Sequence, residues 1–249
     1  MKFSFGKKTE EIKTSLPGKF IVIDGTDGSG KKTQTDLLVE ELKVNGYSVE
    51  VTDFPQYGQK SAGMVEEYLN GKYGQVNPYA ASLFYAVDRY DASFKIREWL
   101  AEGKIVISNR YVTANAGHQG GKIADKDDRI AYFKWLDKTE YGIFNIPKPD
   151  LNIILHVPAE IAQTLVDSKD AGVRGYVQGK KRDLHEEDLD HLKNAERVYL
   201  EIVHLFPNTK LVECVEKEEL LTPAAVHNKV WELVRRIALK QQARSQVQE

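Results

Sequence analysis

The sequence predicts a three-layer α/β fold, with a five-stranded parallel sheet between two layers of helices. The first observation is a set of five short apolar runs, at residues 20–24, 48–53, 105–108, 151–157 and 210–215. The second is that segments with helical spacing separate these runs, which is typical of parallel strands joined by crossover helices. The third is that the runs are continuously apolar, as in Ile153-Ile154-Leu155, and strands buried on both faces have that pattern.

The helices between these strands are predicted from their spacing and their end signals. The first begins near Lys31 and stops at Asn45-Gly46, a common C-terminal signal. Asn77-Pro78 and Thr222-Pro223 each combine an N-cap residue with a first-turn proline, so each opens a helix. Helices are expected over 31–45, 62–69, 79–101, 127–141, 159–167, 186–205 and from 223 onward.

Length, charge and composition limit the domain organisation and the partners that the chain can have. A chain of 249 residues suits one domain, expected over 18–239 after a polar arm (1–17) and before a polar tail (240–249). The net charge of −2 does not favour nucleic acid or an anionic membrane as a partner. We find no apolar run near the roughly 18 residues of a membrane span and no signal-peptide core at the N-terminus. Cys214, the single cysteine, is expected in the fifth strand as a core residue, and a cytoplasmic location is expected.

A glycine-rich turn follows the first strand and carries the main functional signal. The turn reads Gly25-Thr26-Asp27-Gly28-Ser29-Gly30-Lys31 and leads into a helix, which is the order of a phosphate-binding P-loop. Its glycines let successive backbone N–H groups point at one anion, and the helix N-terminus adds partial positive charge. The expected phosphate-binding residues are Gly25, Asp27, Gly28, Ser29, Gly30, Lys31, Lys32 and Thr33.

One position departs from the P-loop pattern. The residue after the P-loop lysine is normally Ser or Thr, whose hydroxyl ligates Mg²⁺, but here it is Lys32. Three possibilities stay open: the hydroxyl of Thr33 takes the metal contact, water takes it, or Mg²⁺ is held less tightly.

Other polar groups are expected at the same edge of the sheet, because ligands of open parallel sheets lie beyond the carboxyl ends of the strands. Asn109-Arg110 follows the third strand, where the arginine fork suits a phosphate group. Tyr85 and Arg89 are four residues apart on the long helix and could hold a base and its phosphate. The basic, glycine-containing insert at about 168–183 is predicted to be a lid that closes over phosphates.

Over residues 18–238 these motifs resemble the thymidylate kinases, which belong to the P-loop nucleoside monophosphate kinase fold. The P-loop resembles that of the family, with an acidic residue at Asp27. Asn109-Arg110-Tyr111 resembles the family's Asp-Arg-aromatic motif. The resemblance also rests on Phe54-Pro55, Tyr85, Arg89, His118-Gln119-Gly120-Gly121 and Pro147-Lys148-Pro149-Asp150.

The resemblance implies an enzyme that transfers the γ-phosphoryl group of ATP to dTMP with Mg²⁺, acting as a homodimer. Gly28 stands where one branch of the family has a P-loop arginine, so a catalytic arginine is expected in the lid. The implied catalytic residues are Lys31, Arg110, Arg174 and Arg182. The implied acceptor-binding residues are Asp27, Phe54, Tyr57, Tyr85, Arg89, Arg110, His118 and Gln119.

Departures from the family pattern leave alternatives open. Lys32 replaces a hydroxyl, Asn109 replaces an aspartate, and His118 stands where an aromatic ring helps to exclude a ribose 2′-hydroxyl. An arginine expected just after Phe54-Pro55 has no clear match, which leaves Tyr57 or Lys60 to reach the phosphate. The alternatives are a kinase for another deoxynucleoside monophosphate and a nucleotide-binding regulatory protein with weakened catalysis.

Overall fold

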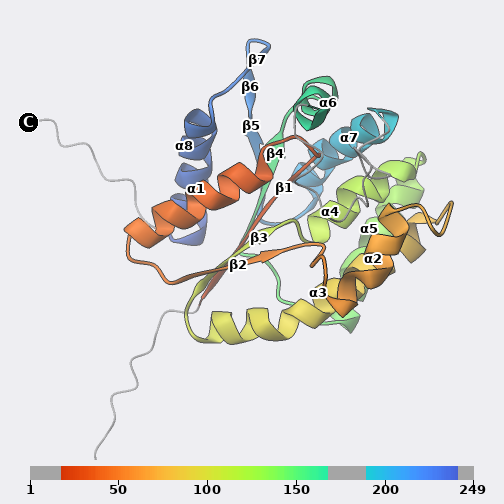
Figure 1. Cartoon of the computed structure of the whole chain (residues 1–249), viewed down its shortest axis with the longest axis horizontal. Helices are drawn as coiled ribbons and strands as arrows, with labels where there is room; N and C mark the ends of the chain where they lie inside the picture. Colours follow the sequence, from red (N-terminus) through yellow and green to blue (C-terminus); the bar gives the residue numbers. More distant parts are fainter. Residues whose placement is uncertain (1–17, 168–188, 241–249) are drawn as a thin grey trace, which may run out of the picture.

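A five-stranded parallel sheet forms the centre of the computed structural model, which describes residues 18–167 and 189–240 (Figure 1). The strand order is β2-β3-β1-β4-β5, so β1, the first of the described strands, is the central one. The strands are β1 Lys19–Gly25, β2 Val49–Asp53, β3 Ile105–Asn109, β4 Leu151–His156 and β5 Thr209–Glu213. The predicted α/β class and parallel sheet are confirmed.

Alternation along β1 divides the core into two layers. Phe20 and Val22 join one apolar cluster, while Ile21 and Ile23 join the other. The first cluster includes residues of α3 Pro78–Ala101, α4 Val112–His118, α5 Lys126–Asp137 and α7 Leu189–Leu205. The second includes residues of α1 Lys31–Val44, α6 Ala159–Asp167 and α8 Pro223–Leu233. Figure 1 shows α1 and α8 together on one side of the sheet.

Short elements complete the described chain. Helix α2, Gly63–Leu69, packs on α3 through a third, smaller apolar cluster. Turns of 3₁₀-helix cover Lys60–Ala62 and Gly120–Lys122, and π-helical turns cover Lys138–Ile143 and Val234–Ala238.

The predicted N-caps form as expected. The Asn77 side chain accepts a hydrogen bond from Ala80 N at 2.9 Å, at the start of α3. The Thr222 hydroxyl accepts one from Ala225 N at 3.2 Å, at the start of α8. Each cap supplies an acceptor to a backbone N–H that has no partner within the helix.

Two local predictions are wrong. Helix α4 was not expected, because it is short and contains residues that favour helices weakly, such as Thr113 and Gly117. The fifth strand does not continue through 215: it ends at Glu213, and Cys214 lies between it and a small antiparallel hairpin. That hairpin consists of β6 Val215–Glu216 and β7 Glu219–Leu220.

Some predictions concern residues outside the described part of the chain. These are the arm at 1–17, the basic insert at 168–183 and all but the first residue of the tail. The division into arm, domain and tail stays a prediction. Within 18–167 and 189–240, every helix is too short or too polar to cross a lipid bilayer.

Candidate active site

The glycine-rich turn between β1 and α1 forms the base of the site. Gly28 and Gly30 both have φ of 86°, in the left-handed region that favours glycine, and Gly30 is the N-cap of α1. The Lys31 ammonium group donates hydrogen bonds to the carbonyl oxygens of Gly25 at 3.1 Å and Thr26 at 2.9 Å. A buried ammonium group at a helix N-terminus gives this turn the positive potential that phosphate oxygens need.

Asp27 and Arg110 meet above the turn. The Arg110 guanidinium donates to Asp27 Oδ1, and the Lys31 ammonium lies 3.7 Å from the same oxygen. Burial opposes ionisation of Asp27, but the charges of Arg110 and Lys31 outweigh it and hold its pKa well below the usual range. Arg110 has φ of 66°, and its N–H donates to the Ile23 carbonyl at 2.9 Å. The structure thus brings Asp27, Lys31 and Arg110 together as the sequence predicted.

A buried carboxylate behind the turn was missed by the sequence reasoning. Asp24 accepts hydrogen bonds from the hydroxyls of Thr113 at 2.7 Å and Tyr199 at 2.8 Å, and from Gly25 N at 2.9 Å. Burial raises the pKa of Asp24. Asp24 therefore ties the P-loop to α4 and α7. An acidic residue directly after four apolar ones, next to Gly25, was the available signal.

The Tyr199 contact needs a glycine in α4. A Cβ atom at Gly117 would lie 2.6 Å from the Tyr199 ring, so any other residue there would displace the ring. The absence of a side chain at 117 is therefore part of what holds the Tyr199 hydroxyl on Asp24.

The loop after β2 contributes one buried and one exposed aromatic residue. Phe54 is 2% exposed and packs against Tyr111 with ring centroids 5.7 Å apart, so its ring belongs to the core. Tyr57 is 37% exposed, and it is one of the groups that raise the pKa of the Arg110 guanidinium. The Asp88 carboxylate fixes this loop by accepting from Gln56 N at 2.8 Å and from the Ser61 hydroxyl at 2.6 Å.

The two residues predicted on α3 lie in different environments. Tyr85 is half-buried and contacts the edge of Tyr68, with centroids 6.4 Å apart. Arg89 is 1% exposed, and its guanidinium makes a bidentate ion pair with Glu140, which is completely buried. A further nitrogen of Arg89 donates to the Tyr111 carbonyl at 3.4 Å. The predicted contact between Arg89 and a nucleotide stays a prediction, and Glu140 was not foreseen.

His118 and Gln119 lie at the end of α4. His118 Nδ1 is 3.3 Å from His191 Nε2 on α7, and the two rings stack. Burial lowers the pKa of His118 well below its usual range, although the Asp27 charge acts in the opposite direction. The Gln119 side chain is fully buried, and within 18–167 and 189–240 its amide has no hydrogen-bond partner.

A small pocket of about 100 Å³ lies on the α1 side of the turn. Its wall combines Gly28, Ser29 and Gly30 with residues that follow β5, among them Cys214 and Leu220. Thr33 is exposed on the first turn of α1 and also lines this pocket. The Lys32 ammonium instead pairs with Asp36 at 2.7 Å on the exposed helix surface.

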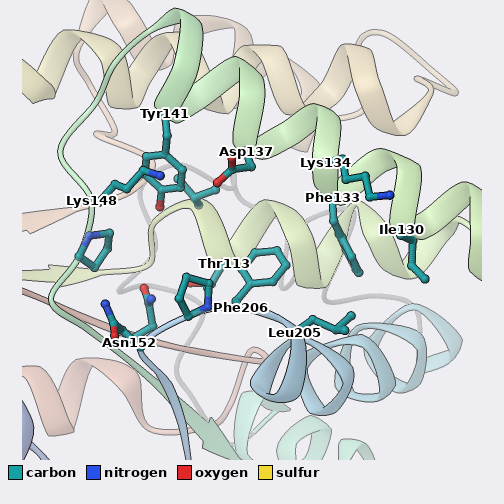
Figure 2. A pocket seen from close by; sticks show the side chains of 14 residues that line it. Thr113, Ile130, Phe133, Lys134, Asp137, Tyr141, Lys148, Asn152, Leu205 and Phe206 are labelled. Atoms are coloured by element: carbon teal, nitrogen blue, oxygen red, sulfur yellow. The ribbon is translucent and has the colours of Figure 1, made fainter.

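A larger cavity of about 430 Å³ lies away from the P-loop, between α5 and the end of α7 (Figure 2). Phe133 and Phe206 point into it, and Lys134, Asp137 and Lys148 contribute polar groups (Figure 2). Its lining includes no residue of the 25–31 turn. The candidate site therefore rests on the convergence of strand ends and not on this larger cavity. Arg174 and Arg182, the predicted lid arginines, fall outside the described residues.

The sequence is similar to known thymidylate kinases over most of its length. The family model for thymidylate kinase matches residues 23–226. A thymidylate kinase of Mycobacterium tuberculosis (strain CDC 1551 / Oshkosh) is 31% identical over 185 residues, which cover 73% of this chain and 84% of that protein. A probable thymidylate kinase of Thermococcus onnurineus (strain NA1) is 28% identical over 231 residues, which cover 89% and 99%.

The fold also has a counterpart among solved structures. The structure of thymidylate kinase from Candida albicans superposes with a TM-score of 0.68 and 24% identity, covering 88% of this chain and 92% of that one. This likeness concerns the fold, because identity at that level is low.

Proposed function

Because the chain belongs to the thymidylate kinase family, we propose that it transfers the γ-phosphoryl group of ATP to dTMP, giving dTDP and ADP. An oxygen of the dTMP phosphate forms a bond to the γ-phosphorus, and the bond from that phosphorus to the β–γ bridging oxygen breaks. The protein's task is to hold two polyanions in line and to neutralise the charge on the migrating group.

One observation carries this proposal: Arg110 and the P-loop lysine, Lys31, both approach the same carboxylate oxygen of Asp27. A protein that only bound one nucleotide would need the P-loop alone. A second guanidinium at the end of β3 suits a second phosphate close to the first.

The roles of the side chains follow from this arrangement. The turn amides and Lys31 hold the donor phosphates, and Arg110 holds the acceptor phosphate. Asp27, kept ionised by its two cationic neighbours, accepts a hydrogen bond from the acceptor sugar. Tyr85 supplies an aromatic face for the base.

His118 and Gln119 are proposed to border the acceptor on the α4 side. The neutral His118 ring and the buried amide of Gln119 add hydrogen-bonding groups there without adding charge. The donor nucleoside is proposed to use the small pocket that Ser29 and Leu220 line, since that pocket opens beside the turn.

Mg²⁺ is the metal that such a reaction uses, and when bound it supplies positive charge to the phosphate oxygens. Its ligands are oxygen atoms, and the site offers the Thr33 hydroxyl and the carboxylate of Asp53 at the end of β2. Hydroxyl and carboxylate oxygens are the ligands that a hard cation prefers, so the chemistry of these two groups fits Mg²⁺.

The enzyme is proposed to act as a homodimer in the cytoplasm. Helix α3 carries five exposed apolar side chains at helical spacing: Tyr79, Leu83, Val87, Tyr90 and Phe94. A continuous apolar stripe of this kind on a long helix suits an interface with a second copy.

An ADP-release assay with ATP and Mg²⁺ against a panel of nucleoside monophosphates tests the activity. We expect turnover with dTMP well above that with dUMP, UMP, dGMP and dAMP. Lys31→Ala should reduce turnover by about 100-fold or more, because it removes the main charge on the donor phosphates. Lys95→Ala, which alters an exposed lysine paired with Glu98 on α3, should not.

Two results would overturn the proposal. One is the lack of turnover with dTMP in protein that is folded and binds ATP. The other is full activity of Lys31→Ala.

A further inference from the structure

Three strand ends lie side by side at the site. Asp53 of β2 is in register with Asn109 of β3, and Asn109 is in register with Ile23 of β1. Residues in register on parallel neighbouring strands point to the same face of a sheet. Ile23 packs in the cluster that includes Leu38 and Leu42 of α1. Asp53 and Asn109 therefore face the side of the sheet on which α1 begins.

Asn109 is the cross-strand neighbour of Asp53. Its side chain favours the ionised form of Asp53 and so lowers the pKa against desolvation, and the backbone N–H of Phe54 donates to the Asn109 carbonyl at 3.1 Å. Asn109 is 8% exposed, and its Oδ1 has no partner among the described residues. The Asp53 side chain, in contrast, is exposed.

The surroundings of Asp53 are cationic. Desolvation by the surrounding residues raises the pKa of Asp53. The positive charges of Arg110, Lys31 and Lys32 act in the opposite direction and lower it. No ion pair of Asp53 within 4.0 Å occurs among the residues that the structure describes. A carboxylate that faces a phosphate site without a fixed counter-ion repels the phosphates unless a divalent cation lies between them.

The two positions that the family pattern would use for a metal are changed in this chain. Lys32 replaces the hydroxyl after the P-loop lysine, and Asn109 replaces the aspartate at the end of β3. Resting on the proposed function, we propose that Asp53 is the protein carboxylate of the Mg²⁺ site, one strand away from position 109, with Asn109 as its positioning residue. The carboxylate then lies at the end of β2 instead of the end of β3, and the site keeps one negative charge.

A carboxylate at position 53 changes what is expected of a substitution at position 109. Asn109→Asp would set a second carboxylate directly beside Asp53, and two carboxylates in contact cannot both ionise easily. We therefore expect no gain from this variant. The double variant Asp53→Asn/Asn109→Asp, which restores one acid and one amide, should recover what Asp53→Asn loses.

The test measures how strongly Mg²⁺ improves ADP binding, by calorimetry with and without Mg²⁺, in the full-length protein. The proteins compared are the wild type, Asp53→Asn, Asn109→Asp, the double variant and Glu50→Gln. Glu50 lies on the same strand and pairs with Lys104 at 2.7 Å, far from the turn, so it is the matched control. Unfolding temperatures within about 3 °C of the wild type verify folding.

The expected result is that Asp53→Asn lowers the Mg²⁺ enhancement about 10-fold or more and raises the Mg²⁺ concentration for half-maximal turnover by a similar factor. The double variant should return within about 3-fold of the wild type, and Glu50→Gln should match it. An Mg²⁺ enhancement in Asp53→Asn equal to that in Glu50→Gln would overturn the inference, as would failure of a folded double variant to recover.

The binding measurement separates this inference from the proposed function. If the wild type failed to phosphorylate dTMP, the proposed acceptor would be wrong, while the ADP and Mg²⁺ titrations would still decide the role of Asp53.

Discussion

At the scale of single residues, the ion pair between Arg89 and Glu140 is the least exposed ion pair among the residues that the structure describes. The two side chains are 1% and 0% exposed, and Asn115 donates to the same carboxylate at 3.4 Å. Glu140 lies in the π-helical turn Lys138–Ile143, a feature common near functional sites. The pair fixes α3, which carries Tyr85, against the segment that leads to β4.

Removing one partner of this pair should be costly. Arg89→Met should lower the free energy of unfolding by about 3–5 kcal/mol, because it leaves a buried carboxylate without a counter-ion. The double variant Arg89→Met/Glu140→Leu should cost less than the sum of the single changes. Urea unfolding of Arg89→Met, Glu140→Leu and the double variant measures this coupling, and additive costs would contradict it.

His156 at the end of β4 gives a prediction about pH. Its ring contacts Glu196 at 2.8 Å and Glu213 at 2.5 Å. Burial alone would lower the pKa of His156, but the hydrogen bonds and charges of the two carboxylates raise it above 6.5. A group whose pKa rises on folding stabilises the protein below its unfolded pKa, and that contribution is lost as pH rises through the folded pKa.

We therefore expect the wild type to exceed His156→Gln in stability by on the order of 1 kcal/mol near pH 6. The difference should shrink as pH rises towards 9. Thermal unfolding of both proteins across this range measures it, and a difference that grew with pH would show that the ring is neutral in the folded protein.

At the scale of elements, the P-loop packs closely against α6 at one glycine, Gly28. A Cβ atom at Gly28 would lie 2.2 Å from the Ala162 carbonyl, whereas one at Gly30 meets nothing within 4 Å. Both residues share a φ of 86°, so they differ in space and not in backbone conformation. Residue 28 can therefore carry no side chain while α6 stays in this position.

Replacing each of these two glycines by alanine should separate the cost of a left-handed backbone conformation from the cost of the clash with α6. Gly30→Ala should cost about 1–2 kcal/mol, the penalty for an L-residue in the left-handed region. Gly28→Ala should cost about 1–3 kcal/mol more, because the loop and α6 must move apart. Urea unfolding measures the costs, and ATP affinity should fall more in Gly28→Ala. Equal effects would mean that α6 adjusts freely.

The elements with local signals were predicted from the sequence, and those that depend on distant partners were not. The parallel strands, the P-loop and the caps at Asn77 and Thr222 each follow from a few adjacent residues. Helix α4 was not predicted, because its stability comes from packing on α7 and not from the helix propensity of its residues. The Glu140 partner of Arg89 is 51 residues away in the chain, and nothing near either residue indicates the pairing.

At the scale of the whole molecule, the apolar stripe on α3 leads to a prediction about assembly. Phe94, 56% exposed, lies at one end of the stripe. Phe94→Glu should shift the protein from dimer to monomer, because a charge at an apolar interface is desolvated without a partner. Light scattering measures the mass. Val44→Glu, at an 85% exposed position on α1, is the matched control and should leave the mass unchanged. A wild-type monomer at all concentrations would contradict the prediction.

The central place of β1 in the sheet bears on how the protein is made. β1 pairs with β3 and β4, although it is synthesised before every other described strand and β4 begins only at Leu151. At elongation rates of about 5–20 residues per second, the apolar segment Phe20–Ile23 waits on the order of ten seconds for its last neighbour. During that interval the strand that leads into the P-loop is apolar and unpaired on one side, and is therefore prone to aggregation. We therefore expect added chaperone capacity during synthesis to raise the yield of folded protein.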